Sequence, residues 1–131
     1  MESKTEITVR HYECDAYGHV NNANYLNYLE HARSEFLKDI GMDYKSFVEA
    51  GFGVYVIKVS ITYKSPALPD DILTITTKPI KRRSASGTFF QQIRIGERLV
   101  CEAEVTWASV GRDGKMTAIP PEWNTSGLNP E

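Results

Sequence analysis

The sequence predicts an α+β fold, in which one long helix is followed by a mostly antiparallel sheet. Apolar residues repeat with helical spacing over residues 23–40, whereas they alternate with polar residues in four segments between positions 55 and 108. Short turns rich in Gly, Pro or Asp separate these segments. Because short turns join antiparallel neighbours, and because the helix precedes the strands instead of alternating with them, this order is typical of the α+β class.

The N-terminal segment predicts a first strand over Thr5–Tyr12. Within it, Ile7 and Val9 alternate with Thr8 and Arg10, the pattern of a half-buried strand. A turn-like stretch that contains glycine follows. We therefore expect five strands in all, one before the long helix and four after it.

The long helix is predicted to begin near Ala23, with Asn22 as its N-cap, and to end before Gly41. Its apolar residues step by four, three, four and four positions and form one stripe: Tyr25, Leu29, Ala32, Phe36 and Ile40. Asp43 is then suited to cap a second, short helix over residues 44–50.

Four strands are predicted after the helices, over residues 55–63, 73–78, 89–95 and 101–108. We expect the segment Lys81–Ser84 to interrupt the strands, a hairpin turn at Gly96-Glu97, and irregular structure from Pro120 onward. A helix of about 18 residues is about 27 Å long, and a strand of about 8 residues reaches about as far. One helix can therefore be covered along its whole length by the sheet.

Composition excludes several classes of function. The chain has 131 residues, 41% of them hydrophobic and 24% charged, and we expect a single domain over residues 1–131. A net charge of -2 gives no general basis for binding nucleic acid or anionic membranes. No secretory signal and no apolar run of about 20 residues is visible. Cys14 and Cys101 lie far apart and the histidines lack ligand spacing, so we predict no disulfide framework, no metal site and a cytoplasmic location.

The run from Cys14 to Leu37 is the segment best suited to chemistry. Asp15 comes just before the predicted helix start, where unpaired backbone N–H groups and the positive end of the helix dipole lie. A carboxylate can attack a carbonyl carbon or activate water, and the N–H groups can stabilise the oxygen that becomes charged. Alternatively, Asp15 closes an Asx-turn before Gly18 and the helix start has only a capping role. Cys14 has no evident activating partner, so we expect it to be structural.

The block Asp15-Ala-Tyr-Gly-His-Val-Asn-Asn-Ala-Asn-Tyr25, followed by Tyr28, Glu30 and Arg33, resembles the 4-hydroxybenzoyl-CoA thioesterase type of hotdog-fold acyl-CoA thioesterase. The strand pattern, the TYKSPALPDD turn and the KRRSAS segment extend the resemblance over nearly the whole chain. It implies a five-stranded antiparallel sheet wrapped around one long helix, and a homodimer as the minimal active unit, often within a homotetramer. It also implies active sites at the subunit interface, with coenzyme A held partly by the neighbouring subunit.

The resemblance assigns the catalytic roles residue by residue. Asp15 supplies the carboxylate, and the backbone N–H of Asn22 is the oxyanion donor. His19 is expected to orient substrate or water, or else to hydrogen-bond the turn. Glu30 is a reserve candidate for the base; alternatively it pairs with Arg33, three residues further along the helix.

The substrate-binding residues are assigned in the same way. Tyr25 is placed in the binding site, with core packing as its alternative because it lies on the apolar stripe. The single basic cluster, Lys81, Arg82 and Arg83 with Ser84, is assigned to the phosphates of coenzyme A, which cations and hydroxyl donors bind well. The alternative for this cluster is a solvated loop.

The sequence therefore predicts an acyl-CoA thioesterase that hydrolyses a thioester to a free carboxylic acid and CoA. No cofactor is expected, because coenzyme A is part of the substrate. Two alternatives remain open: a non-hydrolytic acyl-CoA-binding module, because a fold does not by itself entail activity, and a hydrolase of acyl carrier protein thioesters. A hydratase is disfavoured, because hydratase relatives rely on a paired histidine and acid in a different motif, which this chain lacks.

Overall fold

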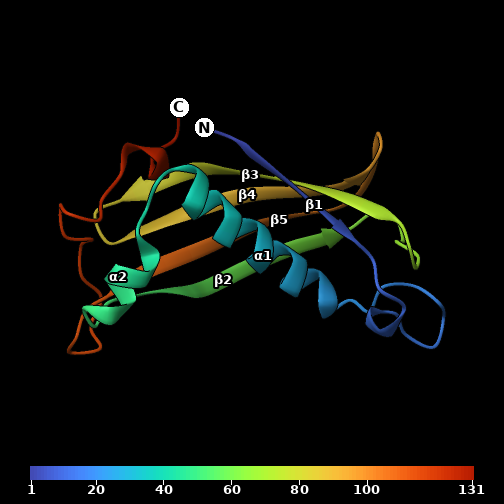
Figure 1. Cartoon of the computed structure of the whole chain (residues 1–131), viewed down its shortest axis with the longest axis horizontal. Coiled ribbons are helices and arrows are strands. Elements are labelled where there is room, and N and C mark those ends of the chain that lie inside the picture. The colour runs from blue at the N-terminus through green and yellow to red at the C-terminus, as the bar shows by residue number, and fades with distance from the viewer.

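The computed structural model describes residues 1–131 as one antiparallel sheet with two α-helices and two 3-10 helices (Figure 1). The strands are β1 (Ser3–Thr8), β2 (Gly53–Tyr63), β3 (Ile72–Arg83), β4 (Ser86–Ile95) and β5 (Arg98–Val110). The helices are α1 (Asn24–Asp39) and α2 (Tyr44–Glu49), with the 3-10 helices η1 (His11–Glu13) and η2 (Ser126–Leu128). Neither α-helix has the length and apolar character that crossing a membrane requires.

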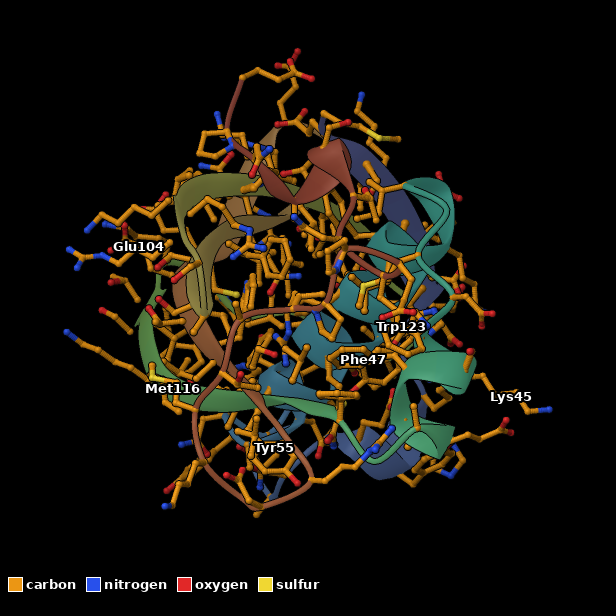
Figure 2. All side chains as sticks on the ribbon, turned by 90° about the vertical axis from the view of Figure 1, so that its left-hand side faces the viewer. Lys45, Phe47, Tyr55, Glu104, Met116 and Trp123 are labelled. Carbon is orange, nitrogen blue, oxygen red and sulfur yellow. The ribbon has the colours of Figure 1, made fainter.

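The sheet has the strand order β1-β3-β4-β5-β2, so that β1 and β2 are its edges. All four neighbouring pairs are antiparallel. α1 lies across one face of the sheet (Figure 1), and Figure 2 shows the sheet curving around the helix. The predicted α+β class, with five antiparallel strands around one long helix, is confirmed.

Two groups of buried side chains hold α1 on the sheet. The N-terminal half of α1 contributes Tyr28 and Leu29 to the larger group, which reaches the middle of the sheet. The C-terminal half contributes Phe36 to a second group, in which Phe47 of α2 and Trp107 of β5 also take part. Burying one large apolar side chain stabilises a fold by about 1.5–3 kcal/mol, so both halves of α1 are firmly anchored.

The predicted boundaries at the end of the long helix are confirmed. Gly41 has a φ of 75°, and its N–H donates to the Lys38 carbonyl at 3.0 Å, which closes α1. The Asp43 carboxylate then accepts from the Ser46 N–H at 3.1 Å and caps α2. These ends follow from local hydrogen bonds, which is why the sequence alone predicts them.

The first strand is shorter than predicted and ends at Thr8 instead of Tyr12. The Arg10 N–H donates to Glu13 Oε1 at 2.8 Å, and the Glu13 N–H donates to the Arg10 carbonyl at 3.0 Å. These reciprocal bonds form a capping box that turns the chain into η1. The strand alternation of the sequence continues past Thr8, but the chain at that point no longer pairs as a strand.

The prediction that Lys81–Ser84 interrupts the strands is wrong. β3 continues through Arg83, which pairs with Ser86 at the start of β4, so the connection is a tight hairpin. The register shifts between Pro79 and Lys81, which marks a bulge within the strand. The basic residues therefore lie on a strand and at its end, not in an open loop.

The C-terminal segment is more ordered than predicted. Beyond Pro120 it forms η2, where the Thr125 hydroxyl accepts from the Gly127 N–H at 3.0 Å. Leu128, within this helix, is buried. The segment therefore packs on the body of the molecule and closes one end of the core.

β2 is an edge strand whose apolar side chains are exposed in the single chain. A register shift between Val56 and Lys58 makes Ile57 a bulge. Tyr55 and Val59 consequently lie on opposite faces of the sheet, contrary to the unbroken alternation in the sequence. The exposed fraction is 60% for Tyr55 and 59% for Ile57. An apolar edge of this kind is a ready template for another strand.

Candidate active site

The loop before α1 brings the Asp15 carboxylate to the surface in a fixed turn. The Asp15 N–H donates to the His19 carbonyl at 2.8 Å, and the Gly18 N–H donates to the Asp15 carbonyl at 3.0 Å. Asp15 Oδ1 accepts from the Tyr17 N–H at 2.9 Å, so the Asx-turn does form. Oδ2 makes no hydrogen bond within the chain, which leaves one carboxylate oxygen open for chemistry.

α1 begins at Asn24, one residue later than predicted, and this changes the role of Asn22. Asn22 is not the N-cap: the helix begins at Asn24, and the side-chain oxygen of Asn21 accepts from the Ala23 N–H at 2.9 Å. The N–H groups of Asn21 and Asn24 are also bonded, to the Glu13 and Asn21 carbonyls, each at 2.9 Å. Among residues 21–24, only the Asn22 N–H donates to no group of the chain, which is the property an oxyanion donor needs.

One open pocket of about 450 Å³ collects the predicted catalytic residues. Asp15, His19, Asn22 and Tyr25 line it, and the end of β2 completes the wall with Tyr63, Lys64, Ser65 and Pro66. Asp15 and His19 are exposed, and the His19 side chain makes no hydrogen bond within the chain. The structure thus brings together the three residues assigned to catalysis.

Tyr25 belongs mainly to the core and only borders the pocket. It is 4% exposed, and its hydroxyl accepts from the Ala67 N–H at 3.3 Å. Burial raises the pKa of Tyr25, so the phenol stays protonated at neutral pH. The ring packs against Tyr63, with the two ring centroids 5.4 Å apart.

Glu13 and Tyr63, which the sequence analysis did not single out, hold this loop in place. Glu13 Oε1 accepts from the Tyr28 hydroxyl, and the Glu13 carbonyl accepts from Asn24 Nδ2, both at 2.9 Å. Burial, together with the bond to Glu13, raises the pKa of Tyr28 and keeps it a donor. Across the pocket, the Tyr63 hydroxyl donates to the Asn22 carbonyl at 3.0 Å. No local pattern indicates these contacts, because they join residues far apart in the sequence.

The basic cluster lies at the other end of the sheet from Asp15. Through the ladder, Arg83 aligns with the Tyr55 end of β2, whereas Tyr63 lines the pocket. Eight residues separate Tyr55 from Tyr63, about 26 Å along a strand. Lys81 and Ser84 are exposed, as is Arg83. One chain alone therefore does not join the cluster to the catalytic pocket.

Arg82 differs from its neighbours because it is bonded within the chain. Its guanidinium donates to the Ser86 carbonyl at 3.2 Å and to Asn124 Oδ1 at 3.0 Å. It also lies over the Trp107 ring, 5.1 Å from the centroid. Burial lowers the pKa of Arg82, which nevertheless remains a cation at neutral pH. Arg82 therefore ties the C-terminal segment to β3 and β4.

A second, mostly apolar cavity of about 140 Å³ lies between α1, the inner face of β2 and the C-terminal segment. Its wall on α1 includes the polar residues Glu30, Arg33 and Ser34 as well as Leu37. Arg33 donates to Gln91 Oε1 at 3.1 Å and forms no ion pair with Glu30, so the alternative role considered for Glu30 is not seen. Glu30 lies eight residues beyond Asn22, about 12 Å along α1. The reserve base is therefore not beside Asp15 within the chain.

Cys14 and the histidines offer no alternative site. Partial burial, then Asp15 and Glu13, raise the pKa of the Cys14 thiol, which disfavours the thiolate that a nucleophile requires. No group of three or more His, Cys, Asp or Glu side chains lies together in a position to hold a metal ion.

Comparison with known proteins places this architecture and pocket in a family. The Thioesterase-like superfamily matches residues 9–125, and the chain belongs to this superfamily. The long-chain acyl-CoA thioesterase FadM of Escherichia coli (strain K12) is 33% identical over 109 residues, 82% of this chain and 82% of that protein. The acyl-CoA thioester hydrolase YbgC of Escherichia coli O6:H1 is 33% identical over 100 residues, 76% of this chain and 75% of that protein.

A solved structure shows the same architecture. The crystal structure of a hypothetical protein from Aquifex aeolicus matches with a TM-score of 0.86 and 29% identity, over 92% of this chain and 94% of that chain. The hotdog fold and the thioesterase family expected from the Asp15–Tyr25 block are both confirmed.

Proposed function

We propose that this protein is an acyl-CoA thioesterase, which hydrolyses a thioester to a free carboxylic acid and CoA. One observation supports this more than any other: an open carboxylate oxygen of Asp15 and the unbonded Asn22 N–H line the same pocket at the start of α1. A reaction at a carbonyl needs both an electron-rich attacking group and a donor for the carbonyl oxygen. Relatives named acyl-CoA thioesterases support the same reaction.

In the proposed reaction, Asp15 acts either as nucleophile or as general base. As base, it accepts a proton from water while the water oxygen forms a bond to the thioester carbonyl carbon. The carbonyl oxygen gains charge and accepts a hydrogen bond from the Asn22 N–H, at the positive end of the α1 dipole. The carbon–sulfur bond then breaks, and the CoA sulfur leaves as thiolate and takes up a proton. A single well-aimed donor contributes about 3 kcal/mol to the rate.

We propose a homodimer formed through β2, alone or as half of a homotetramer. Antiparallel pairing of β2 with a second β2 would cover the exposed Tyr55 and Ile57 and complete the edge of the sheet. The same pairing sets the Tyr55 end of one β2 beside the Tyr63 end of the other. The basic cluster of each subunit would then lie near the catalytic pocket of its partner, where Lys81, Arg83 and Ser84 bind the phosphates of coenzyme A.

The 140 Å³ cavity is the proposed site for the acyl group. It opens on the inner face of β2 at Val54 and Val56, the end that the same pairing brings to the partner's pocket. An apolar cavity of about 150 Å³ accommodates a benzene-sized group. The cavity therefore holds the distal end of an acyl group, and a long chain must extend beyond it. No resident cofactor takes part, and the two free thiols suit a cytoplasmic location.

Release of free thiol tests this function directly. The protein would be incubated with aryl-, short-chain and long-chain CoA esters, and with the same acyl groups on acyl carrier protein. We expect thiol release from at least one CoA ester well above its spontaneous hydrolysis, and slower release from carrier-protein esters. Tight binding of acyl-CoA without thiol release would indicate a binding module and contradict the proposal. Faster release from carrier-protein esters would instead assign the other donor.

A further inference from the structure

The Tyr63 hydroxyl connects the edge strand to the start of α1. It donates to the Asn22 carbonyl at 3.0 Å, although 41 residues separate the two in the chain. The Tyr63 ring is held against Tyr25, with centroids 5.4 Å apart, and Tyr25 is itself bonded to the Ala67 N–H. Although Tyr63 is 45% exposed, its hydroxyl is therefore presented to Asn22 by a ring that packs against Tyr25.

The Asn22–Ala23 peptide unit is consequently held on both of its polar atoms. Tyr63 binds the carbonyl oxygen, and the Asn21 side chain binds the Ala23 N–H at 2.9 Å. On the other side of the Asn22 Cα, the Asn21 carbonyl is fixed by the Asn24 N–H at 2.9 Å. The open Asn22 N–H belongs to the Asn21–Asn22 peptide unit. Because both peptide units that flank the Asn22 Cα are fixed, this N–H points in one direction.

We propose that Tyr63 is a positioning residue, whose hydroxyl fixes the direction of the Asn22 N–H toward the carbonyl oxygen of the thioester. Tyr63 acts through Asn22 and does not itself contact the reacting atoms. The inference rests on the proposed function, because it concerns the oxyanion donor of that reaction. Since Tyr63 lies on the edge strand, ordering of β2 and alignment of the donor are linked.

The protonation state of the Tyr63 hydroxyl agrees with this positioning role. Burial raises the pKa of Tyr63, so the phenol keeps its proton and remains a donor throughout the neutral range. The Asn22 carbonyl has no other donor within the chain. Loss of the hydroxyl would leave this carbonyl to water, which can satisfy it but cannot hold it in one orientation.

The variant Tyr63→Phe tests the proposal, because it removes the hydroxyl and keeps the ring on Tyr25. We expect kcat to fall about tenfold while KM changes by less than about twofold, since a small misalignment of a donor affects the transition state more than substrate binding. Tyr12→Phe is the matched control, because Tyr12 is 73% exposed and its hydroxyl makes no hydrogen bond. The control should retain wild-type kcat, and both variants should unfold at the wild-type temperature.

A spectroscopic measurement separates positioning from a general structural effect. A ketone analogue of acyl-CoA, with CH₂ in place of sulfur and ¹³C at the carbonyl, would be bound to each protein at saturation. In the wild type, a hydrogen bond from Asn22 should move the carbonyl resonance downfield of the free analogue; in Tyr63→Phe, it should return toward the free value. Tyr12→Phe should match the wild type.

The outcomes distinguish this inference from the proposed function. Wild-type kcat and an unchanged carbonyl resonance in Tyr63→Phe, with an active wild-type enzyme, would overturn the positioning role and leave thioester hydrolysis intact. A wild-type protein that releases no thiol from any ester contradicts the function itself. Loss of kcat with an unchanged resonance would also overturn the proposal, because the loss would then come from elsewhere.

Discussion

The two ends of α1 are held in different ways. At the N-terminal end, hydrogen bonds fix the loop: Asp15 binds the Tyr17 N–H and Glu13 binds Tyr28. At the C-terminal end, rings pack on rings: Phe47 stacks on Phe52 with centroids 5.3 Å apart and contacts Trp123 at 5.7 Å. The first end has open polar groups on a hydrogen-bonded loop above its buried side chains, and the second is closed by packed rings. The proposed catalytic groups therefore lie at one end only, although buried apolar side chains anchor both halves of the helix.

The largest effect is expected from removing the ring at the centre of the aromatic end, and it tests whether the two ends of α1 are independent. Phe47 is fully buried, and Phe47→Ala should lower the free energy of unfolding by about 3–5 kcal/mol, because it deletes buried surface and leaves a cavity. Urea unfolding would measure the loss. Val48→Ala on the same helix is the control, since Val48 is 48% exposed and should lose less than about 1 kcal/mol. If the ends are separate, the folded fraction of Phe47→Ala keeps its kcat within about twofold.

Asp15→Asn should lose activity and keep its stability, the reverse of what we expect for Phe47→Ala. We expect kcat to fall by about 100-fold or more, because the amide cannot attack the carbonyl or accept a proton from water. The amide oxygen can still accept from the Tyr17 N–H, so the urea midpoint should stay at the wild-type value. Asp39→Asn, at the exposed end of α1, is the matched control for removing one negative charge. Unchanged turnover in Asp15→Asn would shift the carboxylate role to Glu30.

The smallest expected effect tests whether the distant basic cluster serves the same site. Lys81→Ala combined with Arg83→Ala should raise KM for acyl-CoA about tenfold and leave kcat nearly unchanged, since the phosphates bind equally in ground and transition states. Lys45→Ala, on the exposed face of α2 (Figure 2), is the control for loss of positive charge. Acyl-pantetheine esters lack the nucleotide phosphates, so the wild type and the Lys81→Ala, Arg83→Ala double variant should hydrolyse them equally. A matching rise in KM for acyl-pantetheine would argue against phosphate binding.

Local signals predicted the local parts of this structure. The apolar stripe gave α1, Gly41 its end and Asp43 the cap of α2, because each depends on residues within one or two turns. The block at Asp15 and Asn22 gave the pocket, because its parts lie close together in the chain. The predicted cap at Asn22 is wrong because the N-cap position is Ala23, which has no side-chain cap, and the Asn21 side chain instead accepts from the Ala23 N–H before the helix begins.

The missed features depend on contacts over long distances in the sequence. The bond from Tyr63 to Asn22 exists only because the end of β2 lies beside the start of α1. The apolar–polar alternation of the sequence gives no sign of the bulges at Ile57 and near Pro79. Each bulge nevertheless moves the side chains beyond it to the opposite face of the sheet. No single-sequence pattern contains this information, which arises when the strands pair.

The bulge in β2 has a consequence for how copies of the chain recognise one another. A regular exposed edge would accept almost any extended segment and invite aggregation. Ile57 breaks the row of backbone groups with which an unrelated extended segment would pair. A second copy of the chain carries the same irregularity, and two-fold symmetry sets each bulge in an equivalent place. In the homodimer proposed above, the edge would therefore pair with its own copy in preference to unrelated strands.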